Sequence, residues 1–151
     1  MKIIKIGLTI IAATCLSGCL QPYGKNTKIN IKTAAYLNPD VYGKPAPIAI
    51  TVYELNSQMD FNKASYSQLY NSASDILKNS LIDLHPYTIK PGVNESLSID
   101  VSKQAKYIGI AAGYRRINNA NWKKLIPISN LKTVNLKVDL ESENLIVTIQ
   151  N

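Results

Sequence analysis

Apolar and polar residues alternate along most of this chain, and this period of two constrains the fold more than any other feature. Successive side chains of a β-strand point to opposite faces, so an alternating stretch forms a strand with one buried face and one exposed face. Turn residues separate such stretches about every 8 to 12 residues, which is typical of a β-sandwich. We expect strands at residues 29–33, 48–55, 86–90, 95–101, 107–114, 122–128, 134–140 and 145–149.

The stretch YIGIAAGY, residues 107–114, is apolar on both faces rather than on one. A strand that is buried on both sides has this composition, so we expect it at the centre of a sheet. Its small residues leave room for a large group to pack closely against the backbone. These residues are Gly109, Ala111, Ala112 and Gly113.

One segment has the period of a helix instead. Ser65 and Gln68 form a capping-box pattern, in which the serine accepts a hydrogen bond from the N3 amide and the glutamine reaches back to the cap. Apolar residues then recur at helical spacing, at Tyr66, Leu69, Tyr70, Ala73, Ile76 and Leu77. We expect this stripe to be core, with the helix lying across an edge or face of a sheet. The predicted fold class is therefore all-β, a sandwich of seven or eight strands with a short helical insertion.

The N-terminus carries the pattern of a targeting segment. Lys2 and Lys5 precede an uncharged apolar stretch, residues 6–13, which is too short to span a bilayer as a helix. The next residues, Leu16-Ser17-Gly18-Cys19, match a bacterial lipobox, in which small residues precede the cysteine that receives a diacylglycerol. The alternatives are an ordinary secretory signal or a buried N-terminal helix.

The lipobox divides the chain into three parts. We expect a lipoprotein signal peptide at residues 1–18, a short lipidated tether at 19–27 and the β-sandwich domain at 28–151. Two or three acyl chains at Cys19 would anchor the mature protein to a membrane almost permanently. Leu20, at the position after the cysteine, favours export to the outer membrane, with the domain facing the periplasm from the inner leaflet.

Cleavage at Cys19 also removes Cys15, so the mature chain keeps no free thiol. A disulfide framework and a thiolate metal site are then both excluded. The formal net charge falls from +7 to +5 when Lys2 and Lys5 are lost. The remaining basic pairs are sparse, and export argues against nucleic acid as a partner. We expect a solvated face with some attraction for anionic lipid headgroups or an acidic partner.

Motifs for catalysis and for metal or phosphate binding are nearly absent from the sequence. The only histidine, His85, lies in no metal-ligand spacing and near no nucleophile motif, and we expect it to have a structural or surface role. Glu141 and Glu143 lie in a predicted turn, and Gly43-Lys44 lacks the remainder of a phosphate-binding loop. We therefore expect no enzyme, cofactor or metal site, and a protein that acts by binding.

The best candidate for a binding element is the longest irregular stretch, residues 38–47. It carries Tyr42, a residue type suited to anchoring an interface. The alternative is that this loop is only a solvated connection between two strands.

Three stretches together resemble the TssJ family, the outer-membrane lipoproteins of bacterial type VI secretion systems. They are PAPIAITVYELNSQMDFNKASYSQLY at residues 45–70, TIKPG at 88–92 and YIGIAAGYRRINNANWKK at 107–124. Their order and spacing match the family's second strand and small helix, its Pro-Gly turn, and its arginine-bearing strand followed by a tryptophan. Glu54 stands where the family more often has a glutamine.

The resemblance implies a transthyretin-like β-sandwich that anchors the secretion apparatus to the outer membrane. The implied partner is the periplasmic C-terminal region of TssM, an inner-membrane protein that completes the membrane complex with TssL. The family's loop between the first two strands is associated with that contact, and it corresponds here to residues 38–47. The resemblance thus gives Asp40, Val41 and Tyr42 as candidate partner-binding residues, and it implies no catalysis.

Two other functions remain compatible with the residues. A hydrolase on a transthyretin-like fold would need several histidines and arginines in one cleft, and this chain has a single histidine. An envelope lipoprotein that binds a small ligand or a cell-wall polymer is the stronger alternative, because composition alone does not exclude it.

Overall fold

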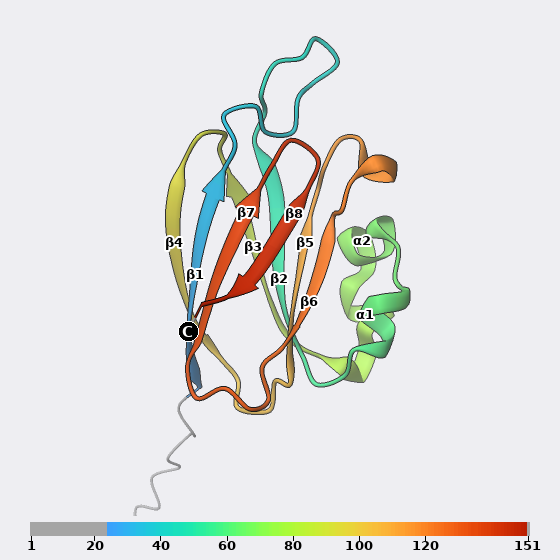
Figure 1. Cartoon of the computed structure of the whole chain (residues 1–151). Helices are drawn as coiled ribbons and strands as arrows, with labels where there is room; N and C mark the ends of the chain where they lie inside the picture. The colour runs from blue at the N-terminus through green and yellow to red at the C-terminus, as the bar shows by residue number, and fades with distance from the viewer. Residues whose placement is uncertain (1–23, 151) are drawn as a thin grey trace, which may run out of the picture.

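The computed structural model describes residues 24–150, so the predicted signal peptide and Cys19 lie outside the described residues. Two four-stranded sheets pack face to face (Figure 1). The first sheet has the strand order β4–β1–β7–β8, with β4 at Asn94–Val101, β1 at Lys25–Thr33, β7 at Val134–Leu140 and β8 at Leu145–Ile149. The second has the order β3–β2–β5–β6, with β3 at Leu81–Ile89, β2 at Ile48–Leu55, β5 at Tyr107–Ala112 and β6 at Lys123–Pro127. The predicted sandwich with a helical insertion is confirmed.

The main core lies between the two sheets and follows directly from the alternation in sequence. In β1, Ile29 and Ile31 are buried whereas Lys28 and Lys32 are exposed. The other strands contribute in the same way, and β5 is buried on both faces as predicted. The largest fully buried contributors to this core include Ile29, Ile31, Ile48, Ile50, Ile89, Ile108, Ile110 and Ile128.

A second, smaller core lies on the outer face of the second sheet, where the helical insertion covers it (Figure 1). The insertion comprises α1 (Met59–Lys63), α2 (Tyr66–Leu77) and a 3-10 turn, η1 (Lys78–Ser80). The ring of Phe61 packs so closely on Gly109 that a Cβ at this glycine would lie 2.7 Å from it. This contact confirms the expectation that the small residues of β5 admit a large group. The buried members of this core are Tyr53, Leu55, Phe61, Ala64, Leu69, Leu77 and Ala111.

The capping box that begins α2 is also confirmed. Ser65 accepts a hydrogen bond from the amide of Gln68, and the Gln68 side chain accepts one from the amide of Ser65. The apolar stripe is only partly core, because Tyr70 is 66% exposed. Ser72 has non-helical backbone angles and kinks the helix, which breaks the regular spacing that the prediction assumed.

Two strands, β1 and β3, begin several residues earlier than the sequence predicts. β1 starts at Lys25 rather than after residue 28, because its first residues pair with the end of β4, with Lys25 opposite Val101. β3 starts at Leu81 rather than at Pro86. A proline inside a strand argues against a central position, but β3 is an edge strand, where a missing amide costs no ladder hydrogen bond.

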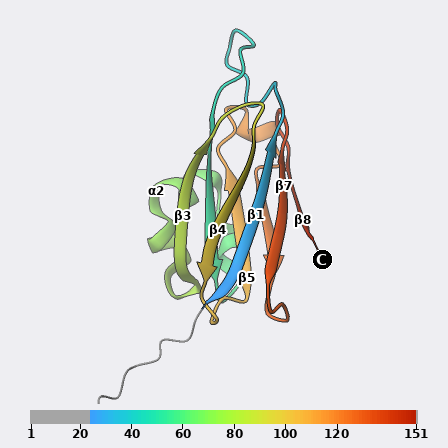
Figure 2. The same ribbon diagram turned by 90° about the vertical axis from the view of Figure 1, so that its left-hand side faces the viewer.

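The two ends of the sandwich differ in what they carry. β1 runs from one end of the sandwich to the other, and the connection from β1 to β2 projects beyond the end opposite to Lys25 (Figures 1 and 2). A 3-10 turn, η2 (Ile117–Asn119), lies in the connection between β5 and β6. Within residues 24–150, no helix has the length and apolar character needed to cross a membrane.

Candidate partner-binding loop

The connection between β1 and β2, residues 34–47, is named here the tip loop. Its base is fixed to the sandwich by Leu37, which is fully buried in the main core, and by Asn38. The side chain of Asn38 donates a hydrogen bond to the carbonyl of Pro47 at 3.0 Å and accepts one from the amide of Arg115 at 2.8 Å. Asn38 has φ 45°, a left-handed conformation that asparagine tolerates better than most residues. The loop therefore leaves the sandwich from a defined base.

The far end of the tip loop is a closed turn built on Asp40. One carboxylate oxygen of Asp40 accepts hydrogen bonds from the amides of Tyr42 and Lys44, each at 2.9 Å. The Asp40 amide donates to the carbonyl of Lys44 at 2.8 Å, and the Gly43 amide donates to the carbonyl of Asp40 at 3.0 Å. Gly43 has φ 77°, which a residue without a Cβ adopts at little cost. Asp40 thus orders the turn from within.

Two large apolar side chains project from this turn into solvent. Val41 is 91% exposed and Tyr42 is 85% exposed, and Tyr36 is 53% exposed in the same loop. A rigid turn that presents an apolar and an aromatic side chain loses little conformational entropy on binding. This arrangement suits docking against another macromolecule.

The structure separates the three candidate residues by role. Val41 and Tyr42 are free to contact a partner, whereas the carboxylate of Asp40 is used by the amides of its own turn. The sequence did not indicate the parts played by Asn38 and Leu37. The Asn38-Pro39 pair and Gly43 gave a signal for turns, but the partners of Asn38 lie 9 and 77 residues away.

An ion pair lies near the base of the tip loop, where the Asn38 amide donates to the carbonyl of Ser142 at 3.3 Å. Arg116 forms an ion pair with Glu143 at 3.1 Å. Tyr114 precedes Arg115, whose amide donates to Asn38, and is 3% exposed. Burial raises the pKa of Tyr114, and the charge of Glu141 raises it further.

His85 lies away from the tip loop, on β3. Its Nε2 atom is 2.8 Å from a carboxylate oxygen of the buried Glu54. A second carboxylate, that of Asp83, lies 4.0 Å from the same nitrogen. Sequence spacing could not pair His85 with Glu54, because the two residues come from different strands and lie 31 positions apart.

The fold and this loop define the class of the protein: an eight-stranded β-sandwich with a helical insertion and one rigid, apolar-tipped loop. A sequence model of the family T6SS-SciN, described as Type VI secretion lipoprotein, VasD, EvfM, TssJ, matches residues 25–143. The chain belongs to this family of type VI secretion lipoproteins. The family description names a secretion lipoprotein and no enzymatic activity.

Solved structures show the same fold. The T6SS lipoprotein TssJ1 from Pseudomonas aeruginosa aligns with a TM-score of 0.80 at 23% identity, over 85% of this chain and 98% of that chain. Lip from Serratia marcescens, a membrane-bound component of the type VI secretion system, gives 0.77 at 22% identity, over 85% and 99%. A chain in the structure of the T6SS protein TssM C-terminal domain from EAEC gives 0.71 at 17% identity, over 82% and 98%. A comparison with curated protein sequences gave no significant match.

Proposed function

We propose that this protein is the outer-membrane-anchored lipoprotein adaptor of a type VI secretion membrane complex. Lipid on Cys19 would hold it in the inner leaflet, with the sandwich facing the periplasm. The tip loop would bind the periplasmic C-terminal region of TssM, which assembles with TssL in the inner membrane. The family and the similarity to a chain in the structure of a TssM C-terminal domain support this assignment.

The observation that carries the proposal is the position of the tip loop. It projects from the end of the sandwich opposite to Lys25, the first residue of β1 (Figure 2). The predicted anchor precedes Lys25 by six residues, which span at most about 20 Å when extended. A domain tethered at that end presents Val41 and Tyr42 away from its membrane, toward a protein that arrives from the inner membrane.

Calorimetric titration tests the contact. The full chain in detergent would be titrated with the periplasmic C-terminal domain of TssM from the same cell. We expect saturable binding at a defined stoichiometry. An exposed tyrosine that becomes an interface anchor contributes about 2 kcal/mol, so Tyr42→Ala should weaken affinity roughly 30-fold.

The matched control is Tyr70→Ala, which removes another exposed tyrosine, on α2 instead of the tip loop. This variant should bind like the unchanged protein. Equal losses in both variants would show that the tip loop is not the contact. Absence of binding at high micromolar concentration, with both proteins folded by circular dichroism, would overturn the adaptor proposal and favour the ligand-binding alternative.

A further inference from the structure

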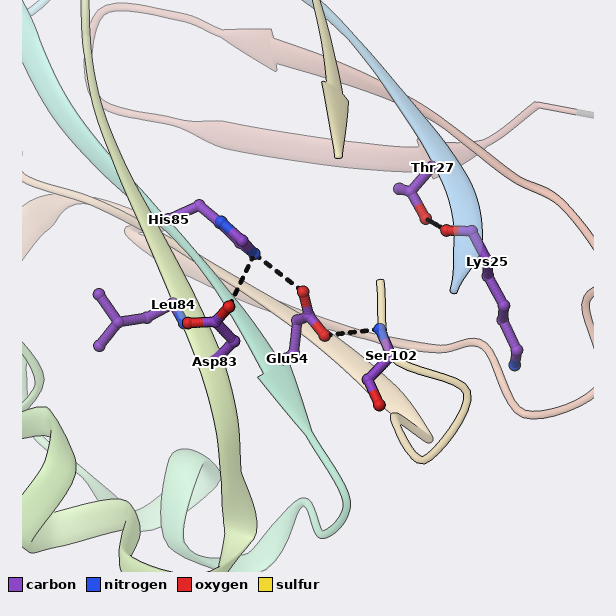
Figure 3. A network of polar contacts seen from close by, with 7 residues as sticks. All are labelled: Lys25, Thr27, Glu54, Asp83, Leu84, His85 and Ser102. Atoms are coloured by element: carbon purple, nitrogen blue, oxygen red, sulfur yellow. Dashed lines mark hydrogen bonds and ion pairs between the residues drawn. The ribbon is translucent and has the colours of Figure 1, made fainter. Parts of the chain in front are cut away.

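A histidine and two carboxylates converge at the end of the sandwich opposite to the tip loop (Figure 3). Glu54 lies near the end of β2, and Asp83 and His85 lie near the start of the edge strand β3. Asp83 is paired directly opposite Glu54, and His85 points to the same face of the sheet two residues further on. The register shifts between Glu54 and Leu55, an irregularity of the kind that redirects side chains next to functional sites.

The three side chains point at one small volume. His85 Nε2 is 2.8 Å from Glu54 Oε1 and 4.0 Å from Asp83 Oδ2, and the three ligand atoms all lie within 4.8 Å of one another. The side chain of Glu54 is only 2% exposed, whereas that of His85 is 25% exposed and that of Asp83 is 63% exposed. The cluster therefore has a fixed inner wall and an opening to solvent.

Neighbouring backbone groups orient both carboxylates. The second oxygen of Glu54 accepts a hydrogen bond from the amide of Ser102 at 2.8 Å, and Ser102 follows β4 of the opposite sheet. The second oxygen of Asp83 accepts from the amide of Leu84, also at 2.8 Å. Each acid thus leaves one oxygen directed toward His85, and outer contacts of this kind hold metal ligands in place.

We propose that Glu54, Asp83 and His85 form a binding site for a divalent transition-metal ion, with Zn²⁺ as the best-fitting ion. Imidazole nitrogen and carboxylate oxygen are common zinc ligands at about 2.0 to 2.2 Å. Two ligand atoms at these distances in a tetrahedron are about 3.4 Å apart. The observed separations of 2.8 Å and 4.0 Å bracket that value, so an ion requires His85 to move slightly away from the buried Glu54 and the exposed Asp83 side chain to rotate toward His85.

The charge of the cluster favours a cation over a simple hydrogen bond. A proton shared between His85 and Glu54 explains the shorter distance but leaves Asp83 as a second anion directed at the same nitrogen. A divalent ion bound between them neutralises both carboxylates at once. Water completes the fourth position through the open side.

A metal ion at this site would tie three strands together. It joins β2 to the edge strand β3, and the Glu54–Ser102 hydrogen bond extends the link to the end of β4 in the other sheet. Because an ion that binds only the folded state stabilises it by mass action, Zn²⁺ should raise the unfolding temperature. This consequence is independent of the proposed contact with TssM.

The test uses the full chain in detergent after treatment with a chelator. Zn²⁺ is titrated in while the unfolding temperature and the imidazole NMR signals are followed. His85 is the only histidine of the sequence, so these signals report on this site alone. We expect saturation at one ion per chain, a higher unfolding temperature and a shift of the imidazole signals. Mg²⁺, which prefers oxygen ligands and retains its water, should produce neither change.

Variants at the two accessible ligands distinguish the site from weak surface binding. Asp83→Asn keeps the acceptor for the Leu84 amide and should weaken Zn²⁺ binding at least about ten-fold. His85→Gln should abolish the rise in unfolding temperature. Asp139→Asn, which alters a carboxylate paired with Lys137 on β7, is the control and should leave binding unchanged. No imidazole shift at roughly 1 mM Zn²⁺, or unchanged affinity in Asp83→Asn, would overturn the proposal.

Discussion

At the scale of single residues, one buried hydroxyl in this fold has no hydrogen-bond partner among the described residues. Tyr114 is 3% exposed, and its hydroxyl has no hydrogen-bond partner within the described range 24–150. Burial raises the pKa of Tyr114 above its ordinary value of 10.0, because the charged phenolate would be poorly solvated there. The buried hydroxyl therefore loses its hydration without gaining a hydrogen bond, which lowers the stability of the folded state.

Tyr114→Phe should therefore stabilise the protein by about 1 kcal/mol at neutral pH, because it removes a buried polar group that lacks a partner. Denaturant unfolding measures this change, with Tyr70→Phe on the exposed face of α2 as the control. The pKa of Tyr114 is raised in the folded state, so the unfolded state loses its proton first as pH rises above about 10. The free energy of unfolding should then fall more steeply above that pH in the unchanged protein than in Tyr114→Phe. A clear loss of stability in Tyr114→Phe would show that the hydroxyl has a partner.

The candidate loop shows what single-residue patterns can predict. Exposed Val41 and Tyr42 follow from a loop with no periodicity, flanked by proline and glycine. The role of Asp40 does not, because its carboxylate accepts hydrogen bonds from backbone amides, which every residue except proline carries. The cluster of Glu54, Asp83 and His85 was equally hidden, since strand pairing and not sequence spacing brings it together.

At the scale of elements, α1 depends on a residue from another element. A helix of five residues cannot form alone, because nucleation fixes several residues for few hydrogen bonds. The Nζ atom of Lys123, on β6, donates to the carbonyls of Phe61, Asn62 and Ala64 at 2.8 to 2.9 Å. A cation at a helix C-terminus satisfies these unpaired carbonyls and complements the helix dipole. Burial lowers the pKa of Lys123.

Lys123→Met should destabilise the protein by roughly 2 kcal/mol, because a methionine keeps the apolar stem and removes hydrogen bonds to a charged group. Lys124→Met is the matched control, since Lys124 is exposed on the same strand and should be near neutral. Thermal or denaturant unfolding measures both, and hydrogen exchange of the amides of residues 61–64 should increase only in Lys123→Met. Similar unfolding curves for the two variants would contradict this role for Lys123.

Elements with strong local signals were predictable, and those built by distant contacts were not. β2, β5, β7, β8 and α2 follow from alternation, apolar runs and a capping box. α1 and the first half of β3 do not, because α1 depends on Lys123 and β3 tolerates Pro86 only as an edge strand. Strand order also escapes the sequence, since β1 pairs in parallel with β7, about a hundred residues later.

At the scale of the whole molecule, the sandwich separates the end that the proposed lipid anchor precedes from the end that carries the tip loop. β1 contains nine residues, which at about 3.3 Å per residue span about 30 Å. Lys25 lies at one end of this strand, and the tip loop extends beyond the other (Figure 1). Val41 and Tyr42 thus lie at the far end of the sandwich from Lys25, the first residue of β1 (Figure 1).

This separation predicts that anchoring and partner binding can be removed independently. Cys19→Ala should release the protein from the membrane fraction and abolish secretion, while its calorimetric affinity for the TssM domain stays within about two-fold, because distant sites act additively. Tyr42→Ala should do the reverse: it should remain in the membrane fraction and lose affinity. Normal secretion by Cys19→Ala would contradict the anchor, whereas reduced affinity in that variant would show that the two ends communicate. Both phenotypes together are expected when the lipid and the partner are held at opposite ends of the sandwich.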